Sequence, residues 1–358
     1  MGTIRTILAI SVVFVHTYGF VFVGGQLAVQ LFYITSGFLI SFVLTEAKTY
    51  KKISSFYFNR FLRLFPMYYI VALITLLTGV LTASGDYEVF NIIKTIFYVD
   101  LFGGIALIFT NIFLIGQDWI MFTGIREGSF QFVTNFRNSE IPVYNGLLIS
   151  QAWTLGLELS FYLIAPFVLK RLNLIIILLI ISILTRIYLY YIGLAFQDPW
   201  TYRFFPTELA FFLFGSLSHQ IWKPYLISRG IINKKLSLIA VFVVILYCVI
   251  FFLLPHRAIN TLILLVLFTS TLPLLLNFQL NNKWDAIIGE LSYPIYISHL
   301  LVLTLVNFVS KEIFNIHYEA LTTALIVVIC SIVFSLFLNI TIGKIISKAR
   351  LKVKINQR

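Results

Sequence analysis

Cysteine and acidic residues are scarce in this chain. Only two of its 358 residues are cysteine, and Asp and Glu together number 14 against 26 Lys and Arg. Cys248 and Cys330 both fall inside apolar runs, so the sequence implies neither a disulfide bond nor a cysteine metal cluster. Charged residues make up 11% of the chain, whereas a soluble globular domain carries about 25%. This scarcity of charge excludes an ordinary soluble domain.

The chain is instead rich in long apolar runs. Hydrophobic residues make up 60% of it, and its mean hydropathy is +0.96, the profile of a protein that crosses a membrane several times. The net charge of +12 does not require a nucleic-acid partner, because the basic residues lie between apolar runs, where they orient a protein in its membrane. The first run, residues 4–23, is too long for a signal-peptide core and lacks a small-residue cleavage site, which predicts an uncleaved first span.

Ten segments have the length and polarity of membrane-spanning helices. They are residues 4–23, 27–45, 66–83, 151–169, 172–193, 204–222, 236–254, 258–276, 286–310 and 320–342. Each is close to the ~20 residues that an α-helix needs to cross the hydrocarbon core. The sequence therefore predicts an all-α integral membrane protein with one transmembrane domain, residues 1–343, and a basic cytoplasmic tail, residues 344–358.

A further apolar segment, residues 91–116, decides the orientation. Lys94, Asp100 and the adjacent Gly103 and Gly104 interrupt it. If this segment does not cross, nineteen Lys and Arg residues lie on the side of both termini and five on the opposite side, which agrees with the preference of basic loops for the cytoplasm. We therefore expect residues 91–116 to be re-entrant or interfacial, residues 117–150 to form an outer loop, and both termini to be cytoplasmic.

Arg5 and His16 are ionisable residues within the first apolar segment. Such side chains are costly in hydrocarbon and are usually functional there. The two are eleven residues apart, about 20° more than three helical turns, so they share a helix face at a spacing of roughly 16 Å. This predicts Arg5 at one membrane surface and His16 near the bilayer centre. The pair indicates a reaction chamber within the membrane, with a cation at its rim and an acid–base group inside it.

Arg60 and Arg63 lie three residues apart in the sequence ISSFYFNRFLRLFP and are neighbours on a helix. Two interpretations are open for them. An interfacial helix at the cytoplasmic surface would use both arginines to contact lipid headgroups. A site for an anionic substrate would use their guanidinium groups to bind phosphate oxygens.

Glu158, in the sequence WTLGLELSFY, lies about two turns into the fourth predicted span. A carboxylate at that depth needs a partner or a proton. A structural ion pair with Arg186 or Arg203 and a catalytic or substrate-binding role are equally compatible with the sequence. Arg203 and Glu208 form a second polar group near the outer end of the sixth span.

The ninth span carries Tyr293, Tyr296 and His299 in the sequence SYPIYISH, at three-residue steps along one flank. An intramembrane histidine of this kind either bridges two helices by hydrogen bonds or belongs to a site. In the second span, Ser36 and Gly37 are compatible with close packing between helices. The remaining histidines fall at span ends or in loops and are expected to be solvated: His219, His256 and His317.

Taken in order, these motifs resemble those of acyltransferase family 3, a family of bacterial integral-membrane O-acyltransferases. Arg5 and His16 match its Arg-x10-His, LFYITSGFLI is similar to F-F-x-x-S-G-F-L-I, and RFLRLFP is similar to R-x-x-R-x-x-P. WTLGLELSFY is similar to W-[ST]-L-x-x-E, and SYPIYISH to S-Y-x-x-Y-x-x-H. Each motif alone is weak, but five in the same order on a ten-span frame make the resemblance strong.

The chain departs from the family pattern in two places. No acidic residue precedes Arg5 directly, and Leu159 follows Glu158 where many members have a second glutamate. We expect no appended extracytoplasmic esterase-like domain, as in the stand-alone members of the family that the chain resembles.

The resemblance implies transfer of an acyl group, most often acetyl, from cytoplasmic acyl-CoA to a hydroxyl of a cell-envelope polysaccharide or its lipid-linked precursor. It implies a bacterial cytoplasmic membrane, acyl-CoA as co-substrate, and no bound cofactor, metal or nucleic acid. The implied catalytic residues are His16 and Glu158, and the implied donor-binding residues are Arg5, Arg60 and Arg63. The implied acceptor-binding or supporting residues are Ser36, Trp153, Arg203, Glu208, Tyr293, Tyr296 and His299.

The chemistry of these residues leaves alternatives open. A neutral imidazole at His16 can deprotonate the acceptor hydroxyl or carry the acyl group itself, and Glu158 can orient His16 or bind sugar hydroxyls. The competing class is a transporter or flippase, which would also carry charges at mid-membrane depth. The absence of an inverted repeat and the shared face of Arg5 and His16 favour the enzyme.

Overall fold

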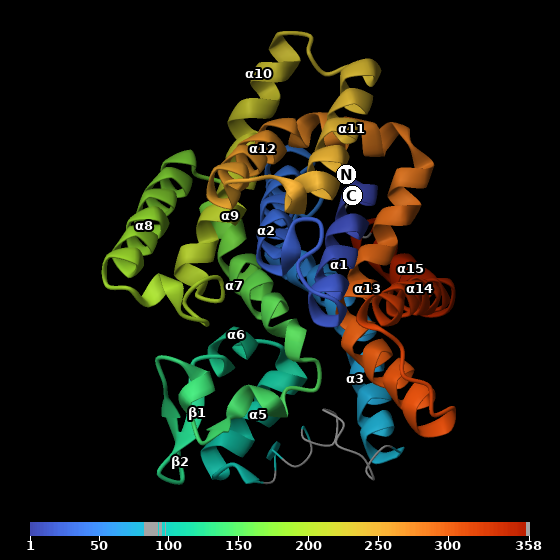
Figure 1. Cartoon of the computed structure of the whole chain (residues 1–358). Helices are drawn as coiled ribbons and strands as arrows, with labels where there is room; N and C mark the ends of the chain where they lie inside the picture. The colour runs from blue at the N-terminus through green and yellow to red at the C-terminus, as the bar shows by residue number, and fades with distance from the viewer. Residues whose placement is uncertain (82–91, 93–94, 97, 356–358) are drawn as a thin grey trace.

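The computed structural model describes residues 1–81, 92, 95–96 and 98–355, and helices form most of this part of the chain (Figure 1). Seven helical stretches in this part of the chain are long and apolar enough to cross a membrane. They are Gly24–Glu46, Ile53–Val80, Leu172–Tyr191, Lys234–Leu253, Arg257–Asn281, Lys283–Ile313 and Ala320–Val353. The predicted class, a multi-pass helical membrane protein, is confirmed. The count of ten crossings and their orientation stay predictions.

The helices near the middle of the molecule are more deeply buried than those at its edges (Figure 1). The central helices and their close neighbours are α1 (Gly2–Thr17), α2 (Gly24–Ser41), α3 (Ile53–Leu81), α7 (Trp153–Val168), α9 (Phe205–Leu217) and α13 (Lys283–Phe308). The others include α8 (Leu172–Tyr191), α10 (Lys223–Ser228), α11 (Lys234–Ile250), α12 (Arg257–Asn281) and α14 (Ala320–Leu338). Only 17% of α8 is buried, and its exposed residues are mostly Ile, Leu and Tyr, as contact with lipid requires.

Helix α1 is shorter than the first predicted span. It ends at Thr17 instead of near residue 23, so it is about 24 Å long at 1.5 Å per residue. The chain then turns back into α2 through Gly19, whose φ of +137° is rarely adopted by residues with a side chain. His16 therefore lies in the last turn of α1, not midway along a 20-residue helix.

The first turn of α1 is held by Asp285 in the first turn of α13. The carboxylate accepts hydrogen bonds from the backbone nitrogens of Gly2 (2.7 Å) and Thr3 (2.9 Å) and from the Thr3 hydroxyl (2.8 Å). A carboxylate suits this position because the first backbone N–H groups of a helix lack intrahelical partners. The backbones also approach closely, since a Cβ on Gly2 would lie 1.8 Å from the carbonyl oxygen of Asp285. This junction fixes α1 against the helix that carries His299.

Helices α2 and α9 also pack with their backbones in close contact. A Cβ on Gly37 would lie 1.8 Å from the carbonyl oxygen of Phe212, and one on Gly215 would lie 1.9 Å from that of Ile34. The Ser216 hydroxyl donates to the carbonyl oxygen of Gly37 at 3.1 Å. Small-residue packing thus explains Gly37, while the adjacent Ser36 contacts α7.

The region between α3 and α7 contains the one departure from an all-helical fold in the described residues. It includes α5 (Leu101–Phe113), α6 (Gln117–Ile120) and a small antiparallel sheet, ordered β2-β1-β3, of β1 (Thr123–Arg126), β2 (Ser129–Phe132) and β3 (Ile141–Pro142). Helix α5 is about 20 Å long, shorter than the hydrocarbon core. It begins where Asp100 accepts a hydrogen bond from the nitrogen of Gly103 (2.9 Å). Of the predicted re-entrant segment 91–116, residues 91, 93–94 and 97 lie outside the described residues.

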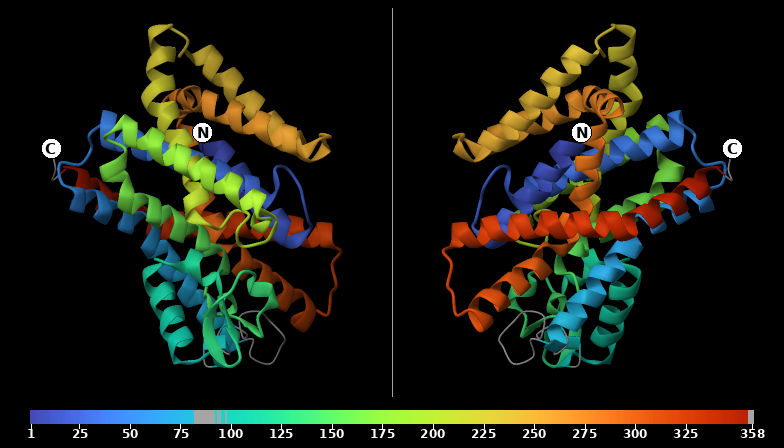
Figure 2. Two further views of the ribbon diagram at one scale, coloured as in Figure 1. Left: turned by 90° about the vertical axis from the view of Figure 1, so that its left-hand side faces the viewer. Right: turned by 90° about the vertical axis from the view of Figure 1, so that its right-hand side faces the viewer.

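The predicted basic tail is helical as far as the structure describes it. Helix α15 (Lys344–Ile355) continues α14 through the π-helical turn Asn339–Gly343. Figure 2 shows α14 and α15 crossing the molecule, with the end of α15 on one side and the α13–α14 connection on the other. Asn59 on α3 donates to the carbonyl oxygen of Arg350 (3.3 Å) and accepts from its Nε (3.4 Å). Residues 344–355 are therefore attached to the helix bundle, and residues 356–358 lie outside the described residues.

Candidate functional site

Five helices bring the predicted residues to a narrow cavity inside the bundle. The cavity has a volume of about 70 Å³, and its polar lining comes from α1, α2, α3, α7 and α13. We call it the arginine cavity; it is lined by Arg5, Ser36, Arg63, Glu158, Tyr162 and Tyr293, among others. Residues from five separate motifs thus meet at one place.

Glu158 is the negative charge of the arginine cavity. Its carboxylate accepts a hydrogen bond from the Ser36 hydroxyl (2.8 Å) and a short one from the Tyr162 hydroxyl. Arg5 and Arg63 line the same cavity, so two positive charges face one negative charge there. This excess of positive charge, enclosed by apolar helices, suits the binding of an anionic ligand group within the cavity.

Of the two interpretations left open for Glu158, the ion pair with Arg186 or Arg203 is not the one formed, because each arginine pairs with another carboxylate. Arg186 instead contacts Glu208 at 2.6 Å, and Arg203 contacts Asp198 at 2.6 Å. Glu208 is fully buried between α2, α8 and α9 and accepts a further hydrogen bond from Gln30 (3.3 Å). The polar group expected from Arg203 and Glu208 therefore consists of two separate ion pairs, and Glu208 connects helices outside the cavity.

Arg60 occupies a different position from Arg63. Its side chain is buried, with its guanidinium carbon 5.6 Å and 5.7 Å from the ring centroids of Phe56 and Tyr162. Its Nη2 donates to the side-chain oxygen of Asn59 (3.2 Å). Arg60 is not part of the cavity lining, so it contacts the site through the ring of Tyr162.

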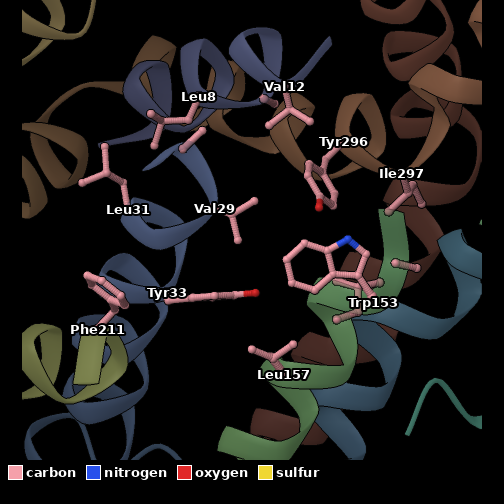
Figure 3. Close-up of a cluster of buried hydrophobic side chains, with 14 of the residues drawn as sticks. Leu8, Val12, Val29, Leu31, Tyr33, Trp153, Leu157, Phe211, Tyr296 and Ile297 are labelled. Atoms are coloured by element: carbon pink, nitrogen blue, oxygen red, sulfur yellow. The ribbon is translucent and has the colours of Figure 1, made fainter. Parts of the chain in front are cut away.

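A second, wider cavity of about 390 Å³ lies along α1 from the first. We call it the histidine cavity; it is lined by His16, Gln26, Arg137, Gln151, Trp153 and Arg203, among others. Val29 and Tyr296 line both cavities. Figure 3 shows the side chains of Val29, Tyr33, Trp153 and Tyr296 turned toward the same space between the helices. The two cavities are therefore adjacent and separated by only a few side chains.

Arg203 is held rigidly at the wall of the histidine cavity. Its guanidinium forms two hydrogen bonds with Asp198, at 2.6 and 3.2 Å, and lies 4.3 Å from the centroid of the Trp153 ring. Asp198 also lies 3.5 Å from Arg137, which is exposed. An aromatic wall with fixed polar groups is a common arrangement in sites for small polar ligands.

His16 and His299 are neighbours. Their ring centroids are 5.2 Å apart, with the rings tilted by 41°. The His299 Nδ1 lies 2.7 Å from the carbonyl oxygen of Tyr296, a distance that requires this nitrogen to carry the proton and donate it. Its Nε2 is buried without a partner. His299 therefore presents a buried hydrogen-bond acceptor beside His16, which is itself exposed.

The expectation that His219 is solvated is wrong. The ring is buried, its Nδ1 lies 2.9 Å from the Ser41 hydroxyl, and its Nε2 lies 2.8 Å from the Glu46 carboxylate. The hydrogen-bonded chain Ser41–His219–Glu46 has the same order of side chains as the serine–histidine–carboxylate triad of hydrolases. Ser41 is fully buried, accepts a hydrogen bond from Gln220 (3.0 Å), and lines neither cavity. The cluster therefore ties the end of α2 to the end of α9.

Sequence reasoning missed two polar residues beside the site. The Tyr33 hydroxyl is buried without a hydrogen-bond partner, and Tyr33 lines the arginine cavity. Asp118 on α6 packs against Gly156 on α7, where a Cβ would lie 2.7 Å from its Oδ1. Burial raises the pKa of the Asp118 carboxyl to about 7. Both occur in ordinary apolar or loop sequence, so only the folded structure reveals their positions.

A family model described as an acyltransferase domain, that of acyltransferase family 3, matches residues 2–342 of the chain. The match covers every helix that contributes to the two cavities. No curated protein and no solved structure matches.

Proposed function

The chain belongs to acyltransferase family 3 and is a membrane acyltransferase, and from this premise we propose that it acylates the cell envelope. It moves an acyl group, most often acetyl, from cytoplasmic acyl-CoA to a hydroxyl of an envelope polysaccharide or its lipid-linked precursor. The observation that carries the proposal is the pair of adjacent cavities, one lined by two arginines and the other by His16.

The arginine cavity suits the donor. Guanidinium groups bind phosphate oxygens through paired hydrogen bonds, and Arg5 and Arg63 come from different helices that converge here. Arg5 lies in the second turn of α1 and His16 in its last, roughly 16 Å apart along the helix. The extended pantetheine arm of CoA has a comparable length. A donor whose phosphates contact the arginines can therefore present its thioester near His16.

Glu158 acts on the donor side in this proposal, because it shares a cavity with Arg5 and Arg63. Its charge balances one guanidinium and fixes the hydroxyls of Ser36 and Tyr162. Arg60 supports the same wall by packing on Tyr162. This donor-side role differs from both alternatives that the sequence left open for Glu158, which were to orient His16 or to bind sugar hydroxyls.

The histidine cavity suits the acceptor. Trp153 and Tyr296 offer aromatic surface, and Gln26 and Gln151 offer hydrogen-bonding amides, which together fit a sugar. His16 takes the proton of the acceptor hydroxyl while the hydroxyl oxygen attacks the thioester carbonyl carbon. The carbon–sulfur bond then breaks, and His16 passes the proton to the sulfur of CoA. In the alternative route His16 itself receives the acyl group and passes it on. His299 supports His16 in either route.

The proposed function is tested by the fate of the acyl group. Purified protein in detergent is expected to release free CoA thiol from acetyl-CoA, with water taking the acetyl group in place of the glycan hydroxyl. Deletion of the gene is expected to remove an acyl group from envelope glycans, as measured by mass spectrometry. Complementation with the wild-type chain restores it. Unchanged glycans, together with purified protein that does not consume acyl-CoA, would contradict the enzyme and favour a transporter or flippase.

The proposal requires a two-sided topology with ten crossings and both termini in the cytoplasm. The short length of α5 and the opposite positions of the end of α15 and the α13–α14 connection support it. With Cys248 and Cys330 replaced by alanine, an impermeant thiol reagent applied to intact cells is expected to label Asn138→Cys and spare Ser347→Cys. Both positions are exposed in the fold. Labelling of Ser347→Cys alone would put the tail outside and break the two-sided mechanism.

A further inference from the structure

The Tyr33 hydroxyl is a buried donor with nothing to bond to. Several buried polar side-chain atoms in the described residues lack a hydrogen-bond partner. Among the residues that line the arginine cavity, only Tyr33 carries such an unpartnered atom. An unpartnered hydroxyl costs free energy, which phenylalanine would avoid in the same space. The sequence LFYITSGFLI resembles the motif F-F-x-x-S-G-F-L-I, which has phenylalanine at the position that Tyr33 occupies here. The hydroxyl is therefore a feature of this chain that packing does not explain.

The ring of Tyr33 is fixed in place. It stacks on Phe212, with the ring centroids 4.6 Å apart and the planes inclined by 24°. Figure 3 shows the hydroxyl pointing away from α9, toward the space bordered by Trp153, Leu157 and Tyr296. A rigid ring with a free O–H aimed into a cavity is a preorganised hydrogen-bond donor.

Tyr33 also lies between the two proposed half-sites. Val29, Tyr33 and Ser36 follow one another at four- and three-residue steps along α2 and so share a face. Val29 borders both cavities, and Ser36 binds the Glu158 carboxylate. The Tyr33 hydroxyl therefore lies between the donor-side carboxylate and the entrance to the histidine cavity, where a thioester carbonyl would pass.

We propose that Tyr33 is a catalytic residue whose hydroxyl donates a hydrogen bond to the acyl carbonyl oxygen in the transition state. The proposal rests on the proposed function. As the acceptor oxygen attacks the carbonyl carbon, negative charge develops on the carbonyl oxygen; when the carbon–sulfur bond breaks, the carbonyl re-forms. Tyr33 keeps its proton throughout and stabilises the charge only while it exists. The same role applies if His16 is the first nucleophile.

The test is Tyr33→Phe in the purified full-length protein, measured by release of free CoA thiol from acetyl-CoA with water as the acyl acceptor. Loss of one donor to a developing oxyanion typically lowers kcat about 10²- to 10³-fold, and we expect kcat to fall by about 10²-fold with KM for acetyl-CoA within about twofold. The thermal midpoint is expected to stay the same or rise, because the variant removes an unpartnered hydroxyl and keeps the stacked ring.

Tyr68→Phe is the matched control. Tyr68 is also fully buried, but its hydroxyl donates to the carbonyl oxygen of Asn111 (2.9 Å), and it lines neither cavity. Its loss is expected to lower the thermal midpoint and leave kcat unchanged, the opposite pattern. Wild-type kcat in Tyr33→Phe would overturn the proposal, and so would a loss of activity matched by a lower midpoint or a raised KM. A wild-type protein that consumes no acyl-CoA would overturn the proposed function and this inference together.

Discussion

Replacing His16 with alanine is expected to abolish acyl transfer while the protein still inserts and folds. His16 lines the histidine cavity together with Trp153 and Tyr296, and its ring centroid lies 5.2 Å from that of His299. A positioned acid–base group typically contributes about 10²- to 10⁴-fold to the rate, and loss of a covalent nucleophile removes the acyl-enzyme intermediate altogether. The measurement is glycan acylation in complemented cells, with variant levels in the membrane checked by immunoblot.

His317→Ala is the matched control for this prediction. His317 is exposed in the connection between α13 and α14, away from both cavities. It is expected to acylate at the wild-type level. Near-normal acylation by a well-expressed His16→Ala protein would return His16 to a structural role and leave the histidine cavity without its chemical group.

The residues that meet at the site could be predicted because membrane helices carry few polar groups. In a chain with 11% charged residues, an arginine, histidine or glutamate within an apolar run stands out. Helical spacing then predicted that Arg5 and His16 share a face, and in the structure both border cavities between α1, α2 and α13. Periodicity cannot say which helices meet. The contact of Glu158 with Ser36 therefore emerged only from the fold.

The sequence failed where backbone geometry or competition between partners decides. The apolar run of residues 4–23 hides the turn at Gly19, so α1 was predicted too long and His16 too far from its end. Glu158 had two candidate arginines, but Asp198 and Glu208 lie closer to those arginines. Tyr33 resembled any aromatic core residue. Its hydroxyl becomes informative only once its surroundings show that nothing bonds to it.

Arg5→Ala and Arg63→Ala are each expected to weaken binding of acetyl-CoA roughly 10- to 100-fold, because each removes charge-assisted hydrogen bonds worth about 1.5–3 kcal/mol. Arg5→Lys and Arg63→Lys keep the charge but lose the paired geometry, so their losses should be smaller. Arg60 supplies a contrast within the same motif. Arg60 packs on Phe56 and Tyr162 outside the cavity lining. Arg60→Lys should therefore lower the thermal midpoint of the protein and leave its affinity for acetyl-CoA nearly unchanged.

Isothermal titration of acetyl-CoA into detergent-purified protein separates these outcomes. Weak binding by the Arg5 and Arg63 variants, with near-normal binding by Arg60→Lys, would assign the donor phosphates to the arginine cavity. Equal losses of acetyl-CoA affinity in the Arg5, Arg63 and Arg60 variants would place the phosphates closer to the N-terminal end of α3. Arg60 and Arg63 are neighbours along the helix there. Unchanged affinity in Arg5→Ala and Arg63→Ala would make these arginines anchors in the membrane or partners of Glu158. The donor would then have to reach His16 by a path that bypasses the arginine cavity.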